Sequence, residues 1–437
     1  MLTDHFFTVL QPYLTQPRKF VLAFSGGVDS RVMLQLLAQF QAKHKNAECI
    51  AVHVHHGLSE HADTWQQQCE SWTNEVGIPL YVEKVTLSLG ARVSIEQAAR
   101  EARYQALEKY ISRDDVLLTG QHSDDQVETF LLALKRGSGP AGLSAMASMS
   151  QFGQGVMVRP LLSVPRHDVE AFAKSEQLEW VEDESNQDTQ FDRNFLRHQV
   201  TPQLNQRWPG FRKSVMRTAE LCAEQESLLT ELLMEKLQFI KQPDGSVDIP
   251  LLHQESDSAR AYLLRMWLAS HQCQMPSRIQ LEQMWQDVAC ASTDANPIFS
   301  LHDMHMRRFQ QRLYLVRPCE DITDWRAPLV DELALPDGLG RLALKALSGR
   351  ELVEFGLRLP SKDEVVTVCF NPEGISAHPQ NRGHSRKLKK LFQEYGIPSW
   401  NRRRTPLIFY GEQLAAVAGL FVCRGFVGQQ CELTWHI

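Results

Sequence analysis

The stretch VLAFSGGVDSRVMLQLL, from Val21 to Leu37, decides the fold of the first part of this chain. Its first four residues are apolar and predict a buried strand, and the apolar residues after Ser30 recur at helical spacing. Gly26 and Gly27 allow the backbone between them to approach a ligand closely, because neither carries a Cβ. The helix start beyond them offers unpaired N–H groups and a positive dipole end. The stretch therefore predicts a phosphate-binding loop.

The loop carries polar side chains of its own but no lysine. Ser25 and Ser30 add hydroxyl donors, and Asp29 is a carboxylate that can hold Mg²⁺. A Walker loop, GxxxxGK(S/T), uses its lysine on the outer phosphates, so transfer of the terminal phosphate is disfavoured here. The alternative of a glycine-rich turn without a ligand is also disfavoured, because six specified positions stand between a strand and a helix.

The composition indicates an ordinary globular protein of a reducing compartment. The chain has 437 residues, which predicts two or three domains. It is 43% hydrophobic and 22% charged, without an apolar run of about 18 residues and without the basic-then-apolar start of a signal peptide. The nine cysteines stand singly, which argues against a disulfide framework or a thiolate metal site. We expect a cytoplasmic protein.

The first two hundred residues alternate apolar runs with helical patterns. This alternation predicts right-handed crossovers and a parallel sheet covered by helices, the α/β class. The expected strands are 19–24, 49–55, 79–85, 115–119 and 156–160. The expected helices are 30–40, 63–76, 94–111, 124–136 and 166–177.

The rest of the chain changes character near residue 211. Helical periodicity dominates to about residue 318, and a segment punctuated by Pro and Gly follows. The last part predicts a small α/β module with a helix at 385–395. We divide the chain into an α/β domain at 1–212, a helical domain at 213–320, a connector at 321–360 and a C-terminal module at 361–437.

A second polar stretch, GQHSDDQVETFLLALKRGSG, follows the fourth expected strand. It therefore lies at the carboxyl edge of the sheet, where open α/β sheets bind ligands. Asp125 and Glu128 are three residues apart at a helix start, so their side chains are neighbours. With His122 they predict a site that holds Mg²⁺ or orients an amine. Asp124 is explained equally well as a helix cap.

The loop SGGVDS resembles that of the N-type ATP pyrophosphatases, or PP-loop family, which cleave ATP between the α- and β-phosphates. A narrower resemblance is carried by HSDDQVETFLLALKRGSG, by RPLL at Arg159–Leu162 and by EDESNQDTQFDRNFLR at Glu182–Arg197. Together with SIEQAAREARYQAL at Ser94–Leu107, these stretches are similar to the bacterial tRNA(Ile)-lysidine synthetase family. One departure is LLALKRGSG, where a basic residue nearer Ala133 is expected.

The resemblance is strong over about 19–204, weak through the helical middle, and returns at 383–422. It implies that ATP adenylates the C2 oxygen of the wobble cytidine in the CAU anticodon of tRNA(Ile), with release of pyrophosphate. The ε-amine of free L-lysine then attacks C2, and AMP leaves. The lysidine formed changes codon reading from AUG to AUA and tRNA identity from Met to Ile. A carboxylate such as Asp125 or Glu128 can orient the amine and take its proton.

The motifs and the resemblance together assign candidate residues to two roles. The catalytic candidates are Asp29, His122, Asp125 and Glu128. The ATP-binding candidates are Ser25, Gly26, Gly27, Val28, Asp29, Ser30, His55 and Gly57, with Asp29 as the Mg²⁺ ligand. By resemblance His55 and Gly57 lie beside the adenine. A zinc site at His53, His55 and His56 is disfavoured, because no carboxylate or thiol stands at ligand spacing.

A basic segment near the C-terminus predicts the RNA-binding surface. From Arg382 to Arg404 eight Lys and Arg stand against one acid, Glu394, in a chain of net charge −6. A run of lysines is usually a solvated helix face, but here three arginines follow Trp400 as well. The predicted RNA contacts are Arg386, Lys387, Lys389, Lys390, Arg402, Arg403 and Arg404, together with Arg103 and Arg197, which are explained equally well as surface or ion-paired arginines.

Rival functions remain at this stage. Another PP-loop tRNA-modifying enzyme, such as a cytidine thiolase, is disfavoured because there is no CxxC pair for an iron–sulfur or persulfide route. An amide-forming synthetase would need an amidotransferase nucleophile, and none is evident. A non-catalytic RNA-binding protein is disfavoured by the intact SGGVDS and HSDDQVET. The expected partners are tRNA(Ile) and free L-lysine, with no membrane, and a homodimer is the oligomeric state considered.

Overall fold

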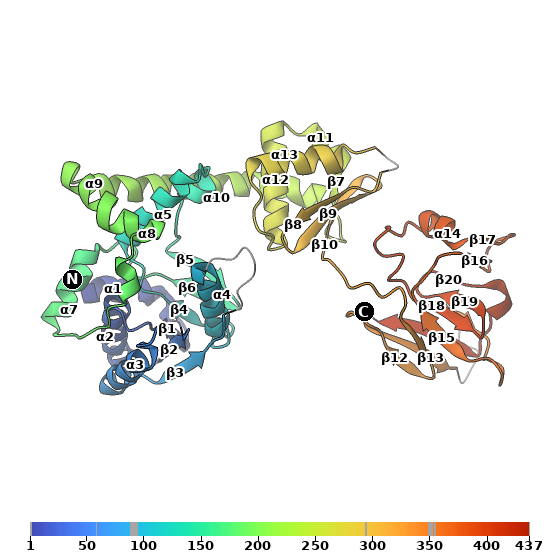
Figure 1. Cartoon of the computed structure of the whole chain (residues 1–437), viewed down its shortest axis with the longest axis horizontal. Coiled ribbons are helices and arrows are strands. Elements are labelled where there is room, and N and C mark those ends of the chain that lie inside the picture. Colours follow the sequence, from blue (N-terminus) through green and yellow to red (C-terminus); the bar gives the residue numbers. More distant parts are fainter. Residues whose placement is uncertain are drawn as a thin grey trace. The chain divides into compact units, whose positions relative to one another are not determined.

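The computed structural model of the chain describes residues 2–57, 59–87, 95–292, 295–347, 353 and 355–436. The chain forms two compact units, Met1–Glu231 and Leu232–Ile437, each of which is described by itself (Figure 1). Within the described ranges, no helix is long and apolar enough to cross a membrane. The division into four segments stays a prediction.

A six-stranded sheet forms the centre of the first unit, in the order β3-β2-β1-β4-β6-β5. Its strands are β1 (Arg18–Ala23), β2 (Ala47–His55), β3 (Leu80–Lys84), β4 (Val116–Leu118), β5 (Met149–Phe152) and β6 (Gly155–Val158). Neighbouring strands are parallel except β5 and β6, which form an antiparallel hairpin at the edge. Val21 of β1 pairs with Ile50 of β2 and Leu117 of β4, so the carboxyl ends of these three strands lie at one edge.

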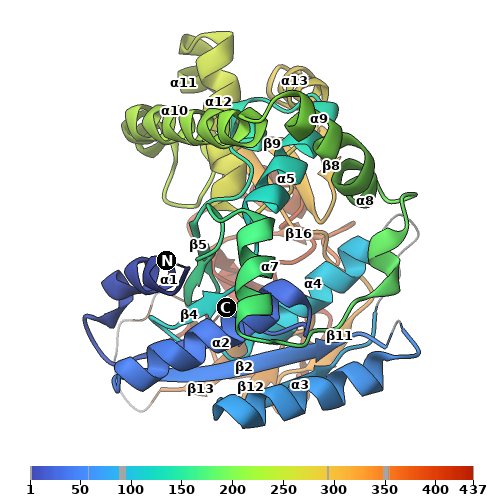
Figure 2. The same ribbon diagram turned by 90° about the vertical axis from the view of Figure 1, so that its left-hand side faces the viewer.

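Helices cover both faces of this sheet, which is why its central strands are apolar without alternation. The covering helices are α1 (Leu2–Leu10), α2 (Val28–Lys43), α3 (Ala62–Val76), α4 (Ile95–Glu108) and α7 (Arg166–Ser175). Phe20 and Leu22 of β1 pack into one core with α1, α2, α3 and α7. Val21 faces the other side and packs with Leu107 of α4. Figure 2 shows α2 and α3 alongside β2.

The α/β class predicted from the sequence is confirmed, and all five expected strands and all five expected helices form here. Their ends differ by a few residues: the helix expected at 30–40, for example, runs from Val28 to Lys43. Ser94, the expected start of α4, lies outside the described residues. Absent from the prediction are α1, the four-residue edge strand β5, which pairs with its hairpin neighbour β6, and several short helices of this unit.

The first unit continues beyond the sheet with short helices and one long one. These are η1 (Gln11–Leu14), α5 (Ser123–Lys135), α6 (Pro140–Leu143), η2 (Glu184–Gln187), α8 (Asp192–Phe195), the π-helical turn η3 (Leu196–Val200), α9 (Thr201–Arg207) and α10 (Phe211–Ile240), whose residues from Leu232 onward belong to the second unit. Val127 and Phe130 of α5 pack with Val215 and Ala219 of α10. Because α5 begins just after β4, its first turn lies at the carboxyl edge of the sheet.

The second unit begins with helices packed on a small antiparallel sheet. Its elements are α11 (Ile249–Gln254), α12 (Asp257–Ser270), α13 (Arg278–Met284), the π-helical turn η4 (Trp285–Ala289), and strands β7 (Val247–Asp248), β8 (Ile298–Leu301), β9 (Met304–Phe309) and β10 (Arg312–Val316). Trp267 of α12 and Met306 of β9 are fully buried in their shared core. This sheet was not predicted, because short strands with Arg and His among their apolar residues show no clear period.

The chain ends in a β-rich module with two main sheets. One has the order β11-β15-β18-β19-β20 and the other β12-β13-β21-β14. The strands are β11 (Arg326–Pro328), β12 (Glu332–Ala334), β13 (Arg341–Ala346), β14 (Gly356–Leu357), β15 (Val366–Cys369), β16 (Ser376–Ala377), β17 (Arg386–Lys387), β18 (Leu407–Tyr410), β19 (Gln413–Val417), β20 (Phe421–Val422) and β21 (Cys431–His436). The 3₁₀ turn η5 is Arg424–Phe426 and the helix α14 is Leu388–Glu394. The segment expected as a connector thus supplies β11 to β14, and the helix expected at 385–395 is shorter.

Candidate active site at the carboxyl edge of the sheet

The loop between β1 and α2 is held open by two glycines and one serine. Gly26 has φ of +88°, and a Cβ there would lie 2.9 Å from the Cys69 sulfur. The Gly26 N–H donates to Ser30 Oγ over 3.0 Å, and that hydroxyl donates to the Gly27 carbonyl over 2.9 Å. Gly27 is the N-cap of α2 and has no side chain to cap it. The loop therefore keeps a fixed backbone conformation and offers a helix N-terminus to an anion.

Asp29, in the first turn of α2, faces the second polar stretch. Its Oδ1 lies 3.7 Å from His122 Nε2 and is buried without a hydrogen-bond partner in the described structure. Burial raises the pKa of this carboxyl group, while the nearby His122 opposes the shift. A Cβ on Gly120 would lie 3.3 Å from Asp29, so the segment after β4 packs directly on it.

His122 joins the loop to helix α5. It caps α5 reciprocally with Asp125: the Asp125 N–H donates to His122 Nδ1 over 3.3 Å, and the His122 N–H donates to Asp125 Oδ2 over 3.0 Å. Because Nδ1 accepts, the ring proton of neutral His122 is assigned to Nε2. That nitrogen lies 3.4 Å from Asp125 Oδ2 and also faces Asp29. The imidazole is 1% exposed, so it is a fixed bridge between two carboxylates.

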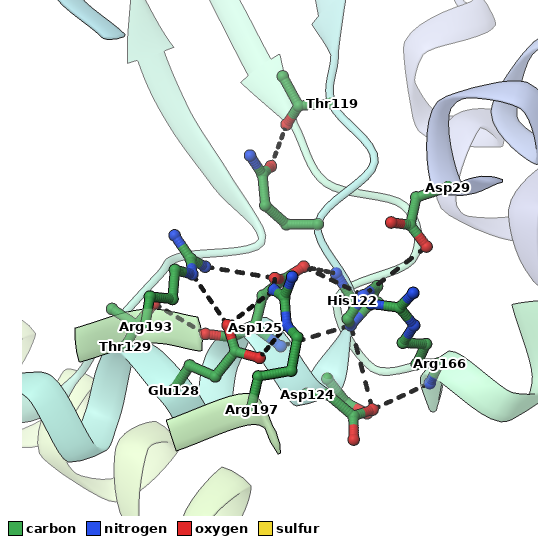
Figure 3. A network of polar contacts seen from close by, with 12 residues as sticks. Asp29, Thr119, His122, Asp124, Asp125, Glu128, Thr129, Arg166, Arg193 and Arg197 are labelled. Carbon is green, nitrogen blue, oxygen red and sulfur yellow. Dashed lines mark hydrogen bonds and ion pairs between the residues drawn. The ribbon is translucent and has the colours of Figure 1, made fainter. Parts of the chain in front are cut away.

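Two carboxylates of α5 meet two arginines of α8 and η3 (Figure 3). Glu128, 1% exposed, accepts from Arg193 Nε over 2.8 Å and from Arg197 Nε over 2.7 Å. Asp125 Oδ1 lies 3.3 Å from Arg193 Nη2 and 3.0 Å from Arg197 Nη2. We call these four residues the acid–arginine cluster; its formal charges cancel.

The cluster stabilises its own ionised forms. Burial alone would raise the pKa of Asp125, but His122 and the Arg193 guanidinium outweigh it, and the pKa is lowered. Burial would likewise lower the pKa of Arg197, but the hydrogen bond and charge of Glu128 raise it. Asp125 is therefore ionised near neutral pH, and both guanidinium groups bind it in that form.

Asp124, the neighbouring acid, holds other elements together. Its Oδ2 accepts from the Arg166 N–H at the start of α7 over 2.9 Å, and its Oδ1 lies 2.8 Å from Arg212 Nη2 of α10. From the sequence, Asp124 was explained equally well as a helix cap and as a site residue. Its contacts show a structural ion pair that links α5, α7 and α10.

The residues expected near the adenine lie at the end of β2. His55 Nε2 lies 3.1 Å from Asp63 of α3, and Gly57 has φ of +67°. Arg103 is exposed and donates to His56 Nε2 over 3.4 Å. Burial, with the Arg103 charge, lowers the pKa of His56 to about 4, so the ring is neutral and can accept. Across the described ranges, no three His, Cys, Asp or Glu are grouped to hold a metal ion.

The predicted RNA contacts of the C-terminal module divide into paired and unpaired groups. Arg386 lies 2.5 Å from Glu394, Arg404 lies 2.6 Å from Asp337, and Arg403 pairs with Glu373. Arg402 Nε donates to the Ile397 carbonyl over 2.9 Å. The exposed lysines, which have no ion pair within the described ranges, are Lys387, Lys389 and Lys390.

Arg193 is the main site residue that the sequence analysis missed. It lies in the quoted stretch EDESNQDTQFDRNFLR, four residues before Arg197. That spacing puts two arginines on one helix face, as Asp125 and Glu128 share a face of α5. The matching spacing of the two pairs is compatible with contact between the two helices, but it does not specify which helix faces meet.

The chain matches known families over most of its length. The model of the PP-loop domain family matches residues 3–204, that of the TilS substrate binding domain matches 248–314, and that of the TilS substrate C-terminal domain matches 366–437. The tRNA(Ile)-lysidine synthase of Vibrio vulnificus (strain CMCP6) is 56% identical over 438 residues, covering 100% of this chain and 99% of the relative. That of Photobacterium profundum is 52% identical over 419 residues and 95% of each chain.

Among solved structures, the U34-tRNA thiolase NcsA from Methanococcus maripaludis aligns with a TM-score of 0.44 at 19% identity, over 51% of this chain and 78% of that one. The family models and the phosphate-binding loop define a PP-loop protein that uses ATP. The full-length identities narrow the class further: the chain belongs to the tRNA(Ile)-lysidine synthase family, and it is an enzyme of the ligase kind.

Proposed function

We propose that this enzyme ligates free L-lysine to C2 of the wobble cytidine in the CAU anticodon of tRNA(Ile), at the expense of ATP. The observation that carries this proposal is the match along the whole chain to relatives named tRNA(Ile)-lysidine synthase. The acid–arginine cluster beside the phosphate loop supports it, because the reaction needs an amine site next to an adenylation site.

In the first step the C2 oxygen of cytidine attacks the α-phosphorus of ATP, and pyrophosphate leaves. The loop from Ser25 to Ser30 would hold the phosphates through its N–H and hydroxyl groups, and His55 and Gly57 would line the adenine. Asp29 fits a divalent cation, because its buried Oδ1 has no hydrogen-bond donor in the described structure. Mg²⁺ bound there would neutralise charge on the phosphates.

In the second step the ε-amine of lysine forms the C2–N bond while the C2–O bond to AMP breaks. The amine attacks only when deprotonated, so a base must accept its proton. Asp125 and Glu128 supply carboxylates for the incoming ammonium group, which takes the place of an arginine N–H in the cluster. His122 is hydrogen-bonded to Asp125 and faces Asp29 over 3.7 Å, so the carboxylates proposed for lysine and the carboxylate beside the phosphate loop are neighbours.

The C-terminal lysines and arginines would bind the tRNA backbone, with Arg103 and Arg197 closer to the reacting base. Lys387, Lys389 and Lys390 are exposed and unpaired in the described structure, which suits phosphate binding. The cytoplasm is the proposed location, and the homodimer stays a prediction. The thiolase alternative lacks support, since the relatives are named synthases of lysidine and no CxxC pair exists.

The test is ATP-dependent incorporation of labelled lysine into purified tRNA. Label is expected in tRNA(Ile) with a CAU anticodon, together with AMP and pyrophosphate, and not in elongator tRNA(Met) with the same anticodon. Pyrophosphate release without lysine incorporation would keep the adenylation step and refute lysine as the nucleophile. Label in both tRNAs would refute the specificity for tRNA(Ile).

A further inference from the structure

Arg31 follows the phosphate loop directly and is an unusual buried cation. Its side chain is 5% exposed, and its Nε and Nη1 have no hydrogen-bond partner in the described structure. Its nearest acid is Glu75, whose oxygen lies 4.0 Å from Nη2 and whose side chain is 60% exposed. A buried charge with so little compensation is costly, and it calls for a role beyond packing.

Arg31 lies against the residue that supports the loop. Its guanidinium carbon lies 5.4 Å from the centre of the Trp72 ring. The same ring lies 3.8 Å from the position of a Cβ on Gly26, the glycine with positive φ. The backbone N–H of Arg31 donates to the Gly27 carbonyl over 2.9 Å, so Arg31 belongs to the first turn of α2 after the loop. Its guanidinium therefore lies close to the loop, and the Trp72 indole contacts both the guanidinium and the position beside Gly26.

The charge of Arg31 supplies what the loop itself lacks. From Ser25 to Ser30 the only charged side chain is the carboxylate of Asp29, and no lysine is present. The α2 N-terminus offers partial positive charge only. A full positive charge held in a buried position acts on a nearby polyanion more strongly than an exposed one, because solvent screens it less.

We propose that Arg31 is a positioning residue for the pyrophosphate half of ATP: it fixes the loop through Trp72 and adds the positive charge that a Walker loop takes from its lysine. This inference rests on the proposed adenylation reaction. Arg31 then acts on the β- and γ-phosphates of ATP. Binding of the AMP half and the rate of lysine transfer do not depend on it.

The test is direct binding of pyrophosphate and of AMP to the full chain by calorimetry, with Mg²⁺ present. In Arg31→Met the affinity for pyrophosphate is expected to fall about tenfold, with AMP binding changed by less than about twofold. The KM for ATP in adenylation should rise by a similar factor, and lysine transfer to pre-adenylated tRNA should keep its rate. Arg31→Lys should recover most of the affinity.

Arg18→Met is the matched control. Arg18 stacks 5.9 Å from the Tyr13 ring centre and also has a buried Nε without a partner in the described structure, but it starts β1 at the opposite end from the loop. This variant should bind pyrophosphate like the unmodified chain. Equal losses for pyrophosphate and AMP in Arg31→Met, unchanged pyrophosphate binding there, or no recovery in Arg31→Lys would each overturn the proposal.

Pyrophosphate binding needs neither tRNA nor lysine. The binding experiment therefore tests the role of Arg31 independently of whether the enzyme makes lysidine. Normal lysidine formation with unchanged pyrophosphate binding in Arg31→Met would refute only the role of Arg31. A chain that makes no lysidine, yet loses pyrophosphate affinity selectively in Arg31→Met, would keep Arg31 and refute lysine transfer.

Discussion

Two regions of this molecule pair arginines with an acid, and they differ in burial. In the first unit Glu128 is 1% exposed and is held by Arg193 and Arg197, which are 30% and 22% exposed. In the C-terminal module the side chain of Glu394 is 29% exposed and its partner Arg386 is 45% exposed. Both regions pair a carboxylate with guanidinium groups, but the carboxylate is buried in the first unit and partly exposed to solvent in the C-terminal module.

Burial, and not the number of ion pairs, decides how much such a pair contributes to stability. Removing one partner of a buried pair leaves a charge without solvent, which costs several kcal/mol. An exposed pair contributes about 0–1 kcal/mol. The acid–arginine cluster is therefore held rigidly, as the proposed amine site requires, whereas the surface pairs of the C-terminal module contribute little to stability.

The largest effect is expected for Glu128→Gln. Lysine transfer should fall about a thousandfold, because the variant loses the carboxylate that receives the amine, whereas adenylation should stay within a few fold. Single-turnover transfer from adenylated tRNA measures this. The control is Glu170→Gln, whose partner Arg166 lies 2.8 Å away at a partly exposed position of α7, and which should be nearly neutral. Normal transfer in Glu128→Gln would remove Glu128 from the mechanism.

Removing one arginine from each region compares the stability contributed by a buried ion pair with that of an exposed one. Arg197→Met should lower the free energy of unfolding of the first unit by about 3 kcal/mol, because Glu128 loses two buried donors. Arg386→Met should cost no more than about 1 kcal/mol. Hydrogen exchange of amides in the β1 core and in β18 reports each unit separately. Equal costs would break the distinction between the two regions.

A smaller effect is expected for the triple replacement of Lys387, Lys389 and Lys390 by alanine. Binding of tRNA should weaken about tenfold at moderate salt, and the slope of log affinity against log salt should fall by up to about 3. The comparison variant replaces Arg403 and Arg404, which already pair with Glu373 and Asp337, and should change the slope less. An unchanged salt slope in the triple variant would show that these three lysines do not contact the tRNA backbone.

The smallest effect concerns the surface pair of Arg358 and Glu364. The hydrogen bond from Arg358 lowers the pKa of Glu364 to about 2. A lowered folded-state pKa contributes stability above the unfolded value, about 4.3, and loses it as the pH falls toward 2. In Glu364→Gln the stability lost on lowering the pH should be smaller than in the unmodified chain. Thermal melts of the C-terminal module between pH 5 and 3 measure this loss. Identical pH profiles would contradict the pairing.

The sequence was most informative where function depends on local spacing. The loop from Ser25 to Ser30 and the α5 start at His122, Asp125 and Glu128 each lie within one short stretch, and the structure brings both to one edge of the sheet. Parallel strands joined by helices place successive strand ends together, so this proximity followed from the predicted topology.

What the sequence did not reveal depends on long-range packing. Arg193 and Arg197 meet Glu128 across more than sixty residues of chain, and no local pattern specifies which helix faces meet. Arg31 looks like an exposed residue of an amphipathic helix until Trp72 of α3 is found beside it. The sheet of β8 to β10 was missed because its short strands stand beside strong helical periodicity.

The central claim is that the phosphate loop performs adenylation and the acid–arginine cluster performs lysine transfer. The most direct measurement follows both half-reactions in Glu128→Gln and Asp29→Asn, using ATP labelled at the α-phosphate, tRNA(Ile) and lysine. Adenylated tRNA should accumulate in Glu128→Gln, and Asp29→Asn should form neither adenylated tRNA nor lysidine at a normal rate. Loss of adenylation in Glu128→Gln, together with normal adenylation in Asp29→Asn, would contradict the account.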